Sequence, residues 1–295
     1  PRIQDAVPIL QALPRSATGQ LLTSYVSMIS GPTPNTDGSL KEIHIILMDN
    51  QRTAMASDEK FREALQCIRC AACLNVCPVY RLIGGHAFGY VYTGGIGTIL
   101  TSWFNEMKNA EDIQGLCITC GRCREVCPGK INIPELILEI RRRLVRKQGM
   151  PFIQKSALSV VNNRSLFHAM LRAGYLAQKP FVKEGFIRHL PLFFSSLSEF
   201  RSLPPVAKTA FHVKFRKLRQ PRCAEKAVFF TGCAIDFLYP EIGEAVVKVL
   251  NKAGVEVIVP EEQTCCGTPS RISGAYDMAA DCAVRNIQAL LKDDV

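Results

Sequence analysis

The alternation of apolar and polar positions is clearest in the last quarter of the chain. Apolar runs at Ala227–Thr231 and Val255–Val259 have the length of strands, and between them Pro240 opens a helical pattern that closes at Gly254. A second helical pattern covers about Ala275–Leu291. Strands that alternate with helices predict a parallel sheet with right-handed crossovers. We therefore expect a parallel βαβα unit in this region.

The first part of the chain has a strand-like pattern. The isoleucine-rich segment Glu42–Met48 predicts a strand, Asp49–Arg52 predicts a turn, and Thr53–Ala56 predicts the start of a return strand. Ser57 is a typical N-cap residue and predicts a short helix from Asp58 to about Gln66.

The middle of the chain has mostly helical periodicity. An amphipathic helix is expected from about Thr98 to Ala110, and another from Pro134 to Lys147, because proline suits the first turn of a helix. The periodicity of residues 152–222 is interrupted by prolines, which predicts two or three helices and a basic linker.

These patterns predict a multi-domain α/β protein with four parts, since 295 residues is enough for more than one domain. The expected parts are residues 1–56, residues 57–150, residues 151–222 and residues 223–295. The first part is too short for a complete α/β domain, so we expect it to be the end of one. The second should be largely helical.

The net charge limits the classes of partner. The chain has 36 Lys and Arg against 26 Asp and Glu, a formal charge of +10, and the excess is concentrated at Arg141–Lys147 and Arg216–Arg222. We interpret these segments as a solvated helix face and a solvated linker. The alternative is a docking surface for an acidic redox partner or anionic lipid headgroups. No aromatic residues are interleaved with the charges, so a nucleic-acid partner is not expected.

Eight of the thirteen cysteines form one spacing twice. The spacing is C-x2-C-x2-C-x3-C followed by proline, and the second copy lies 50 positions after the first. The eight residues are Cys67, Cys70, Cys73, Cys77, Cys117, Cys120, Cys123 and Cys127. This is the ligand spacing of bacterial ferredoxins with two [4Fe–4S] clusters.

The spacing also predicts which cysteines share a cluster. Three cysteines at i, i+3 and i+6 reach three corners of one cluster, while the fourth points away and reaches the other cluster. The first expected ligand set is Cys67, Cys70, Cys73 and Cys127, and the second is Cys117, Cys120, Cys123 and Cys77. Structural zinc is the alternative, although zinc sites usually pair two short C-x2-C units for each metal.

Three further cysteines form a weaker candidate site. Cys233 follows the first predicted strand of the βαβα unit, and Cys265 and Cys266 follow the second. The carboxyl ends of parallel strands lie at one edge of a sheet, where such folds bind ligands. We expect a metal site there rather than buried structural thiols. Cys223 and Cys282 fit no motif and are expected to be structural.

These last motifs resemble a known family. Gly232-Cys233 and Cys265-Cys266-Gly267-Thr268-Pro269 are similar to the first half of the cysteine-rich CCG domain. That domain occurs in heterodisulfide reductases and in the iron–sulfur subunits of enzymes that oxidise glycolate, glycerol-3-phosphate and lactate. The resemblance implies a further C-x-x-C beyond Val295, so a cluster at this incomplete third site is expected only in a longer chain.

A second resemblance covers about residues 10–150. The segments Pro14–Gln20, His44–Asn50, Cys67–Tyr80 and Gly84–Tyr90 resemble the lactate-utilisation iron–sulfur protein B family. The resemblance implies that residues 1–56 are the end of an LUD domain, followed by a ferredoxin-type domain. The CCG part resembles the separate lactate-utilisation protein A, so the chain is expected to be a piece of a fusion. Ala71 departs from the family pattern, which has glycine there.

The resemblance implies an iron–sulfur electron-transfer subunit of an L-lactate-oxidising complex. Its partners would be the other subunits of the complex and a redox partner whose identity the sequence does not give. The alternatives are a subunit of a glycolate or glycerol-3-phosphate dehydrogenase, a heterodisulfide-reductase-like enzyme, and a regulatory iron–sulfur protein.

Several features that would indicate another location or a catalytic role are not found in the sequence. No secretory signal is visible and no run of 18 apolar residues occurs, which predicts a cytoplasmic protein without a transmembrane segment and leaves open a peripheral contact at the inner face of the membrane. We expect no catalytic residue in this chain: His86 is interpreted as a loop hydrogen-bonding residue and His44 as structural. Gly95-Ile96-Gly97 lacks the third glycine of a dinucleotide-binding motif.

Overall fold

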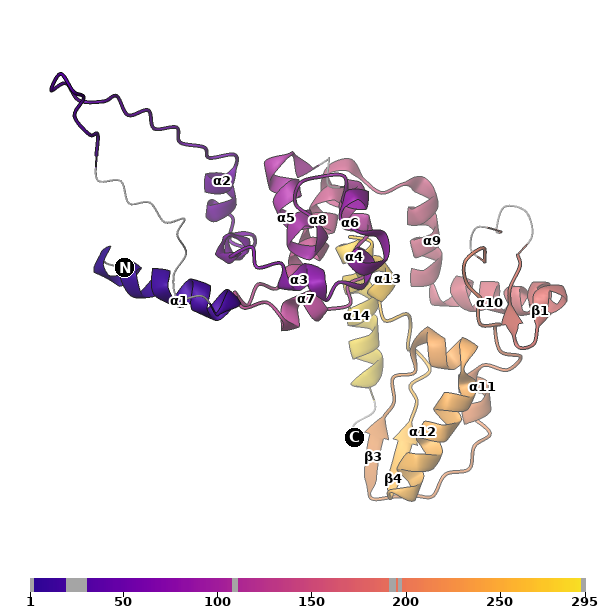
Figure 1. Cartoon of the computed structure of the whole chain (residues 1–295). Helices are drawn as coiled ribbons and strands as arrows, with labels where there is room; N and C mark the ends of the chain where they lie inside the picture. The colour runs from indigo at the N-terminus through magenta and orange to yellow at the C-terminus, as the bar shows by residue number, and fades with distance from the viewer. Residues whose placement is uncertain (1–2, 20–30, 108–110, 191–194, 196–197, 293–295) are drawn as a thin grey trace. The chain divides into compact units, whose positions relative to one another are not determined.

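The computed structural model describes residues 3–19, 31–107, 111–190, 195 and 198–292, and it divides into two units, residues 1–49 and residues 50–295 (Figure 1). The first unit contains the 3-10 turn η1 (Ile3–Asp5) and helix α1 (Ala6–Thr18). Helix α1 ends at Gly19, which adopts a left-handed conformation and donates its N–H to the Arg15 carbonyl. A single antiparallel bridge joins Pro34 to Leu40 around a tight turn.

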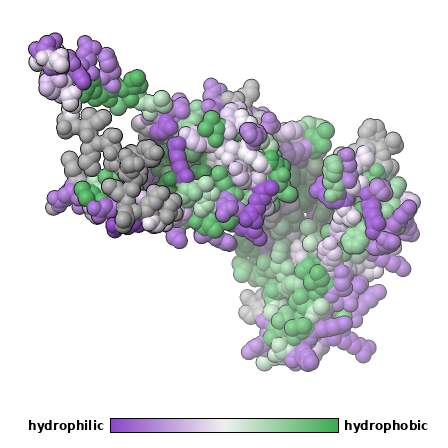
Figure 2. Space-filling model, viewed as in Figure 1, coloured by the Kyte–Doolittle hydropathy of each residue, from purple (hydrophilic) through white to green (hydrophobic). Residues whose placement is uncertain are grey.

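The strand predicted at Glu42–Met48 is not formed in this unit. The segment has no strand assignment, and its apolar side chains are exposed, Leu47 by 92%. Figure 2 shows it as a hydrophobic stretch at the molecular surface. An extended segment becomes a strand only when a neighbouring strand bonds its N–H and C=O groups, and the described part of this unit offers none. The described residues of 1–56 therefore do not form the expected sheet.

The second unit opens with helices instead of the predicted return strand. Thr53–Ala56 lies inside helix α2 (Arg52–Ser57), which is followed by the 3-10 turn η2 (Arg62–Gln66). The predicted N-cap, Ser57, is the last residue of α2. Asp58 caps the next turn, since its Oδ1 accepts from the N–H groups of Lys60 and Phe61 at 3.0 and 3.2 Å.

Short helices dominate the region of the cysteine repeats. They are α3 (Ala72–Asn75), α4 (Pro78–Ile83), η3 (His86–Phe88), α5 (Gly94–Phe104), α6 (Glu111–Gly115), α7 (Arg122–Glu125) and α8 (Ile133–Gln148). Helix α8 begins and ends within one residue of its predicted bounds. Helix α5 begins four residues before the predicted Thr98 and ends at Phe104; residues 108–110 of that prediction lie outside the described residues.

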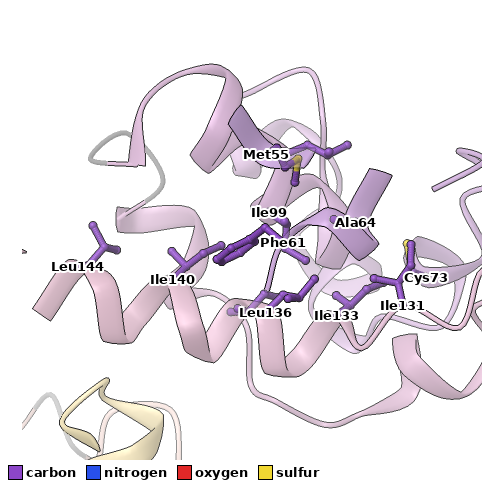
Figure 3. Close-up of a cluster of buried hydrophobic side chains, with 12 residues drawn as sticks. Met55, Phe61, Ala64, Cys73, Ile99, Ile131, Ile133, Leu136, Ile140 and Leu144 are labelled. Carbon is purple, nitrogen blue, oxygen red and sulfur yellow. The ribbon is translucent and has the colours of Figure 1, made fainter. Parts of the chain in front are cut away.

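A compact apolar core holds this region together (Figure 3). Helices α5 and α8 contribute aliphatic side chains, among them Ile99 and Ile140. Met55 of α2 and Phe61, the residue before η2, complete the core. The Phe61 ring packs edge-on against Trp103 at 5.5 Å between centroids. Cys73 belongs to the same core, so the first cysteine repeat is anchored on it.

Glycine permits the close approach between α5 and its surroundings. A Cβ at Gly95 would lie 2.8 Å from the Ile133 side chain, and one at Gly97 would overlap the backbone of Tyr92. Both glycines therefore allow a helix start that bulkier residues would push away from the cysteine loops.

The connecting region consists of small elements. They are α9 (Phe152–Asn162), α10 (Arg164–Gln178), η5 (Lys179–Phe181), the strands β1 (Val182–Lys183) and β2 (Phe186–Ile187), and α11 (Phe211–Phe215). Strands β1 and β2 pair antiparallel. The sequence predicts two or three helices here, and the described part of the region has three α-helices. The hairpin was not predicted.

The last region contains two parallel strands and the helices around them. Its elements are β3 (Glu225–Val228), the π-helical turn η7 (Ala234–Leu238), α12 (Pro240–Lys252), β4 (Val255–Ile258), α13 (Thr268–Ile272) and α14 (Tyr276–Leu290). Strands β3 and β4 lie side by side in Figure 1, with Glu225 opposite Val255 and Val228 opposite Ile258. Helix α12 connects the two strands and covers Phe211 and Val257 in a second core.

This last region packs on α8 and α9 through specific contacts. Gly274 has φ +83, and a Cβ on it would lie 2.5 Å from the Arg141 carbonyl oxygen, so only glycine fits the turn between α13 and α14. The Arg271 guanidinium pairs with Glu135 at 2.7 Å. The Asn162 amide donates to the Met278 carbonyl at 3.0 Å. The cysteine repeats and the parallel strands are thus joined by more than the connecting chain.

We expect the Gly97→Ala substitution to lower the free energy of unfolding by about 1–3 kcal/mol, because the added methyl group overpacks a filled site. The matched control is Gly174→Ala in α10, where nothing lies within 4 Å of the added carbon. Alanine favours a helix over glycine, so the control should be stabilised by up to about 1 kcal/mol. Thermal unfolding under anaerobic conditions measures both, and equal effects of the two changes would contradict this account of Gly97.

Candidate functional site

The two cysteine repeats fold into loops of the same kind. The first passes through left-handed backbone at Arg69 and Ala71 (φ 58° and 62°), and the second does so at Thr119 and Gly121 (φ 55° and 82°). Each loop then enters one turn of helix, α3 or α7, which carries the third cysteine of its repeat. Ala71 occupies a conformation that costs an L-residue roughly 1 kcal/mol or more. The 50-residue repeat in sequence is thus also a repeat in backbone conformation.

Two cavities in this region are lined by the cysteines. The first is lined by Cys67, Cys70, Cys73 and Cys127. The second is lined by Cys77, Cys117, Cys120 and Cys123, and Cys73 also reaches it. Helices α3 and α7 pack on each other, which brings the two repeats together. Each cavity therefore combines three sulfurs of one repeat with the fourth of the other, and the ligand sets themselves stay a prediction.

Backbone N–H groups point at some of these sulfurs. Cys77 is the N-cap of α4, and its Sγ accepts from the Tyr80 N–H at 3.5 Å, with Pro78 in the first turn. The Cys117 Sγ accepts from the Thr119 N–H at 3.4 Å. Such bonds favour a negatively charged sulfur.

Burial acts in the opposite direction on several free thiols. It raises the pKa of Cys73 and of Cys117, and together with the neighbouring Cys117 and Cys120 sulfurs it raises the pKa of Cys123 to about 12. These thiols are neutral at pH 7 unless a cation balances them. Bound metal deprotonates a coordinating thiol outright, so the sites fit an occupant that supplies positive charge next to the sulfurs.

The donor set and its spacing fit iron–sulfur clusters. Every candidate ligand at the two cavities is a soft sulfur donor, which suits such clusters. Within the described ranges, no three His, Cys, Asp or Glu side chains lie close enough to hold a single metal ion. The repeated C-x2-C-x2-C-x3-C spacing is that of ligands to two [4Fe–4S] clusters.

The buried apolar side chains around the cavities come from outside the cysteine motifs. Ile68 and Ile118, next to the first cysteines of the two repeats, line the cavities but remain 69% and 61% exposed. The buried apolar walls come from outside the motifs, namely Ile131 and Ile133 at the first cavity and Phe88 at the second. They were not recognised because they share no local pattern with the cysteines.

The arginines near the cavities have distinct surroundings. Arg69 donates to the Tyr92 hydroxyl at 2.9 Å and lies 4.9 Å from the centroid of that ring. Arg122 and Arg124 are exposed. Arg141, assigned from the sequence to a solvated helix face, is buried, and its guanidinium donates to the Cys117 carbonyl at 2.6 Å. That assignment was wrong, because position 141 lies on the buried face of α8.

The third candidate site is partly assembled. Cys233 and Cys265 line a further cavity, at the loops that follow β3 and β4. The Cys265 thiol donates to Cys233 and lowers the pKa of Cys233 to about 7, while the same contact, with burial, raises the pKa of Cys265. Cys266 is exposed, and its thiol donates to the Thr268 hydroxyl at 3.2 Å. The metal site expected at these three residues stays a prediction.

Sequence reasoning missed the histidines of this third cavity. The His212 Nδ1 lies 2.8 and 2.9 Å from the two Asp236 carboxylate oxygens, and the His212 backbone N–H donates to Oδ1 at 2.9 Å. His168 stacks on His212 with ring centroids 5.7 Å apart. The three residues come from α10, α11 and η7, so no sequence spacing could have brought them together.

The other histidines and cysteines considered in the sequence analysis do not line these three cavities. His44, expected to be structural in a strand, is exposed and lies 3.4 Å from Glu42. His86 is exposed at the start of η3. Cys282 is buried, and its thiol donates to the Asn162 side chain at 3.0 Å, in agreement with a structural thiol. Cys223 is half-buried in the loop before β3.

Across the part of the chain that the structure describes, no helix combines the length and the apolar character needed to cross a membrane.

Family models match two parts of the chain. Residues 63–131 match the 4Fe-4S dicluster domain, and residues 227–295 match the cysteine-rich domain. The first match contains both cysteine repeats and thus all eight cysteines that line the two cavities. The second contains Cys233, Cys265 and Cys266. The chain is an iron–sulfur protein.

The chain is also similar to curated proteins named lactate utilization protein B. The chain is 34% identical to lactate utilization protein B of Bacillus licheniformis over 77% of its own length and 48% of the relative. It is 36% identical to that of an Exiguobacterium species (74% and 47%), and 34% identical to that of Bacillus subtilis (72% and 45%). The chain thus spans about half the length of the curated relatives it matches. No solved structure matches it significantly.

We expect the stability of the protein to fall as the pH drops from about 6.5 to about 4. Burial, and then the positive charge of Arg164, lower the pKa of His168 from 6.5 to about 4. Between these values the unfolded chain binds a proton that the folded chain does not, so stability is full above pH 6.5 and declines by roughly 2–3 kcal/mol at most. His168→Gln should flatten this part of the pH profile, measured by urea unfolding. The exposed-histidine control His86→Gln should not, and an unchanged slope in His168→Gln would contradict the assignment.

Proposed function

We propose that this chain is the iron–sulfur electron-transfer part of a system that oxidises L-lactate or a related 2-hydroxy acid. The carrying observation is the pair of neighbouring cysteine-lined cavities with Cys73 at both. The similarity to lactate utilization protein B supports the choice of substrate class. Partners would be the other proteins of that system and an electron acceptor.

The chemistry of a hydroxy acid explains why two one-electron sites are useful. Oxidation of the alcohol to a ketone releases two electrons and two protons. A bound [4Fe–4S] cluster supplies a one-electron relay. The residues of this chain hold two such relays side by side, and the buried Ile131 and Ile133 keep water from the first. No residue of the ferredoxin-type region is proposed to touch the hydroxy acid.

The proposed ligand sets are crossed between the two repeats. Each set takes three cysteines from one loop and the fourth from the loop after the other repeat's helix. The sets are Cys67, Cys70, Cys73 and Cys127 at the first cavity, and Cys117, Cys120, Cys123 and Cys77 at the second. A third cluster at Cys233, Cys265 and Cys266 would need ligands beyond those described.

Iron and sulfide analysis tests the central part of this proposal. Anaerobically purified protein should contain about eight irons per chain, four in each cluster. Cys120→Ser removes a proposed ligand of the second cluster and should reduce the content to about four. The matched control is Cys223→Ser, which changes a cysteine of the loop before β3 and should leave the content unchanged. Bound zinc, without an EPR signal on reduction, would contradict the proposal.

The crossed arrangement makes a separate prediction for EPR spectra of the reduced protein. Cys70→Ser and Cys127→Ser should disturb the same signal, although they lie in different repeats. Cys120→Ser and Cys77→Ser should disturb the other signal. If Cys127→Ser instead disturbed the same signal as Cys120→Ser, each repeat would hold its own cluster and the crossing would be wrong.

A further inference from the structure

Arg141 lies on the buried face of α8 with only 6% of its surface exposed. Its guanidinium makes four hydrogen bonds, all to uncharged acceptors. Nε donates to the Gln114 side-chain oxygen at 2.7 Å, Nη1 donates to the Ile272 carbonyl at 3.0 Å, and Nη2 donates to the carbonyls of Gln114 and Cys117 at 2.5 and 2.6 Å. These four bonds cover most of the five N–H donors of the guanidinium, and none of the acceptors carries a negative charge.

The two neighbouring arginines, unlike Arg141, have carboxylate partners. Arg142 pairs with Glu139 at 2.7 Å, and Arg143 pairs with both Glu139 and Asp58 at 2.8 and 2.6 Å. For Arg141, no carboxylate among the described residues lies within ion-pair distance. A buried charge without a counter-charge is strongly unfavourable. The hydrogen bonds compensate the lost water contacts of Arg141, but they leave its net positive charge unbalanced.

The missing negative charge has a natural source at the second cavity. The carbonyl that Arg141 contacts belongs to Cys117, whose sulfur lines that cavity. Four thiolates around an oxidised [4Fe–4S] cluster leave a net negative charge, and reduction adds one more. We propose that Arg141 is the internal counter-ion of the second cluster and the positioning residue of its ligand loop. This inference rests on the two-cluster function proposed above.

The same side chain also reaches the cysteine-rich region. Ile272 is the last residue of α13, the helix that follows Cys265-Cys266-Gly267. The turn after it packs on the Arg141 backbone through Gly274. Arg141 therefore fixes the loop of Cys117 and the end of α13 at one point. The charge of the second cluster and the docking of the cysteine-rich region are coupled through this guanidinium.

A fixed positive charge favours the more negative, reduced state of a cluster, so it raises the midpoint potential. Removing the charge should shift the potential of the second cluster to a more negative value. The first cluster, whose proposed ligands Arg141 does not contact, should keep its potential. A purely structural side chain would not produce this selective change.

The test is an EPR-monitored redox titration of the full chain with both clusters bound. The variants are Arg141→Gln, Arg141→Lys and the control Arg142→Gln, which removes an equal charge one residue away on the same helix. The signal of the second cluster is identified as the one lost in Cys120→Ser. We expect a negative shift of this signal alone in Arg141→Gln, a much smaller shift in Arg141→Lys, and none in Arg142→Gln.

The outcomes separate this inference from the proposed function. Unchanged potentials in Arg141→Gln, or equal shifts in Arg141→Gln and Arg142→Gln, would overturn the role of Arg141 while leaving two clusters in place. If Arg141→Gln does not bind the second cluster, selective loss of about four irons that Arg141→Lys restores supports the inference. Loss of both clusters without rescue by lysine overturns it. Absence of clusters from the unaltered protein would instead refute the proposed function.

Discussion

The two cysteine repeats depend on each other, because each cavity is lined by cysteines of both repeats. This arrangement constrains the rest of the ferredoxin-type region. The loops must lie side by side, so α3 packs on α7 and both repeats enter their helices from left-handed backbone. Cys73, which reaches both cavities, is also part of the apolar core of α5 and α8. The packing of the apolar core therefore also positions the cysteine sites.

Burial of several cysteine sulfurs disfavours their charged, metal-binding form. Burial raises the pKa of the Cys73, Cys117 and Cys123 thiols and so favours neutral sulfur at these three positions. Buried Arg141 is the opposite case, a cation without a carboxylate among the described residues. A bound iron–sulfur cluster would address both effects. Its iron ions would stabilise the thiolates, and its net negative charge would balance Arg141. The charges of the polypeptide thus complement an iron–sulfur cluster better than they complement each other.

The sequence predicts features that depend on local spacing. The cysteine repeats, the bounds of α8 and the order of β3, α12 and β4 follow from periodicity and motif alone. Features that depend on tertiary neighbours were missed. Glu42–Met48 has the composition of a strand but no partner strand in the described part of its unit. Arg141 is the buried member of a basic run in which Arg142 and Arg143 are half-buried in ion pairs and Arg146 and Lys147 are exposed.

The histidine and aspartate of the third cavity belong to the same class of missed features. His168, His212 and Asp236 come from three different elements, and only the fold makes them neighbours. Residues 152–222, interpreted from the sequence as helices and a linker, therefore supply part of the wall around Cys233 and Cys265. A family model for residues 227–295 cannot include that wall, since His168 and His212 precede it in the chain.

The third site also differs from the first two in the state of its thiols. At Cys73, Cys117 and Cys123 burial dominates and the thiols stay protonated without metal. At Cys233 a hydrogen bond from the Cys265 thiol dominates, and the pKa falls to about 7. A sulfur that is half ionised near neutral pH is a better nucleophile and a readier metal ligand than a buried neutral one. The Cys233 sulfur therefore ionises more readily than the buried Cys73, Cys117 and Cys123 sulfurs, whose pKa is raised. Arg141 joins the loop of Cys117 to the end of α13, so one buried side chain contacts the backbone next to both kinds of sulfur site.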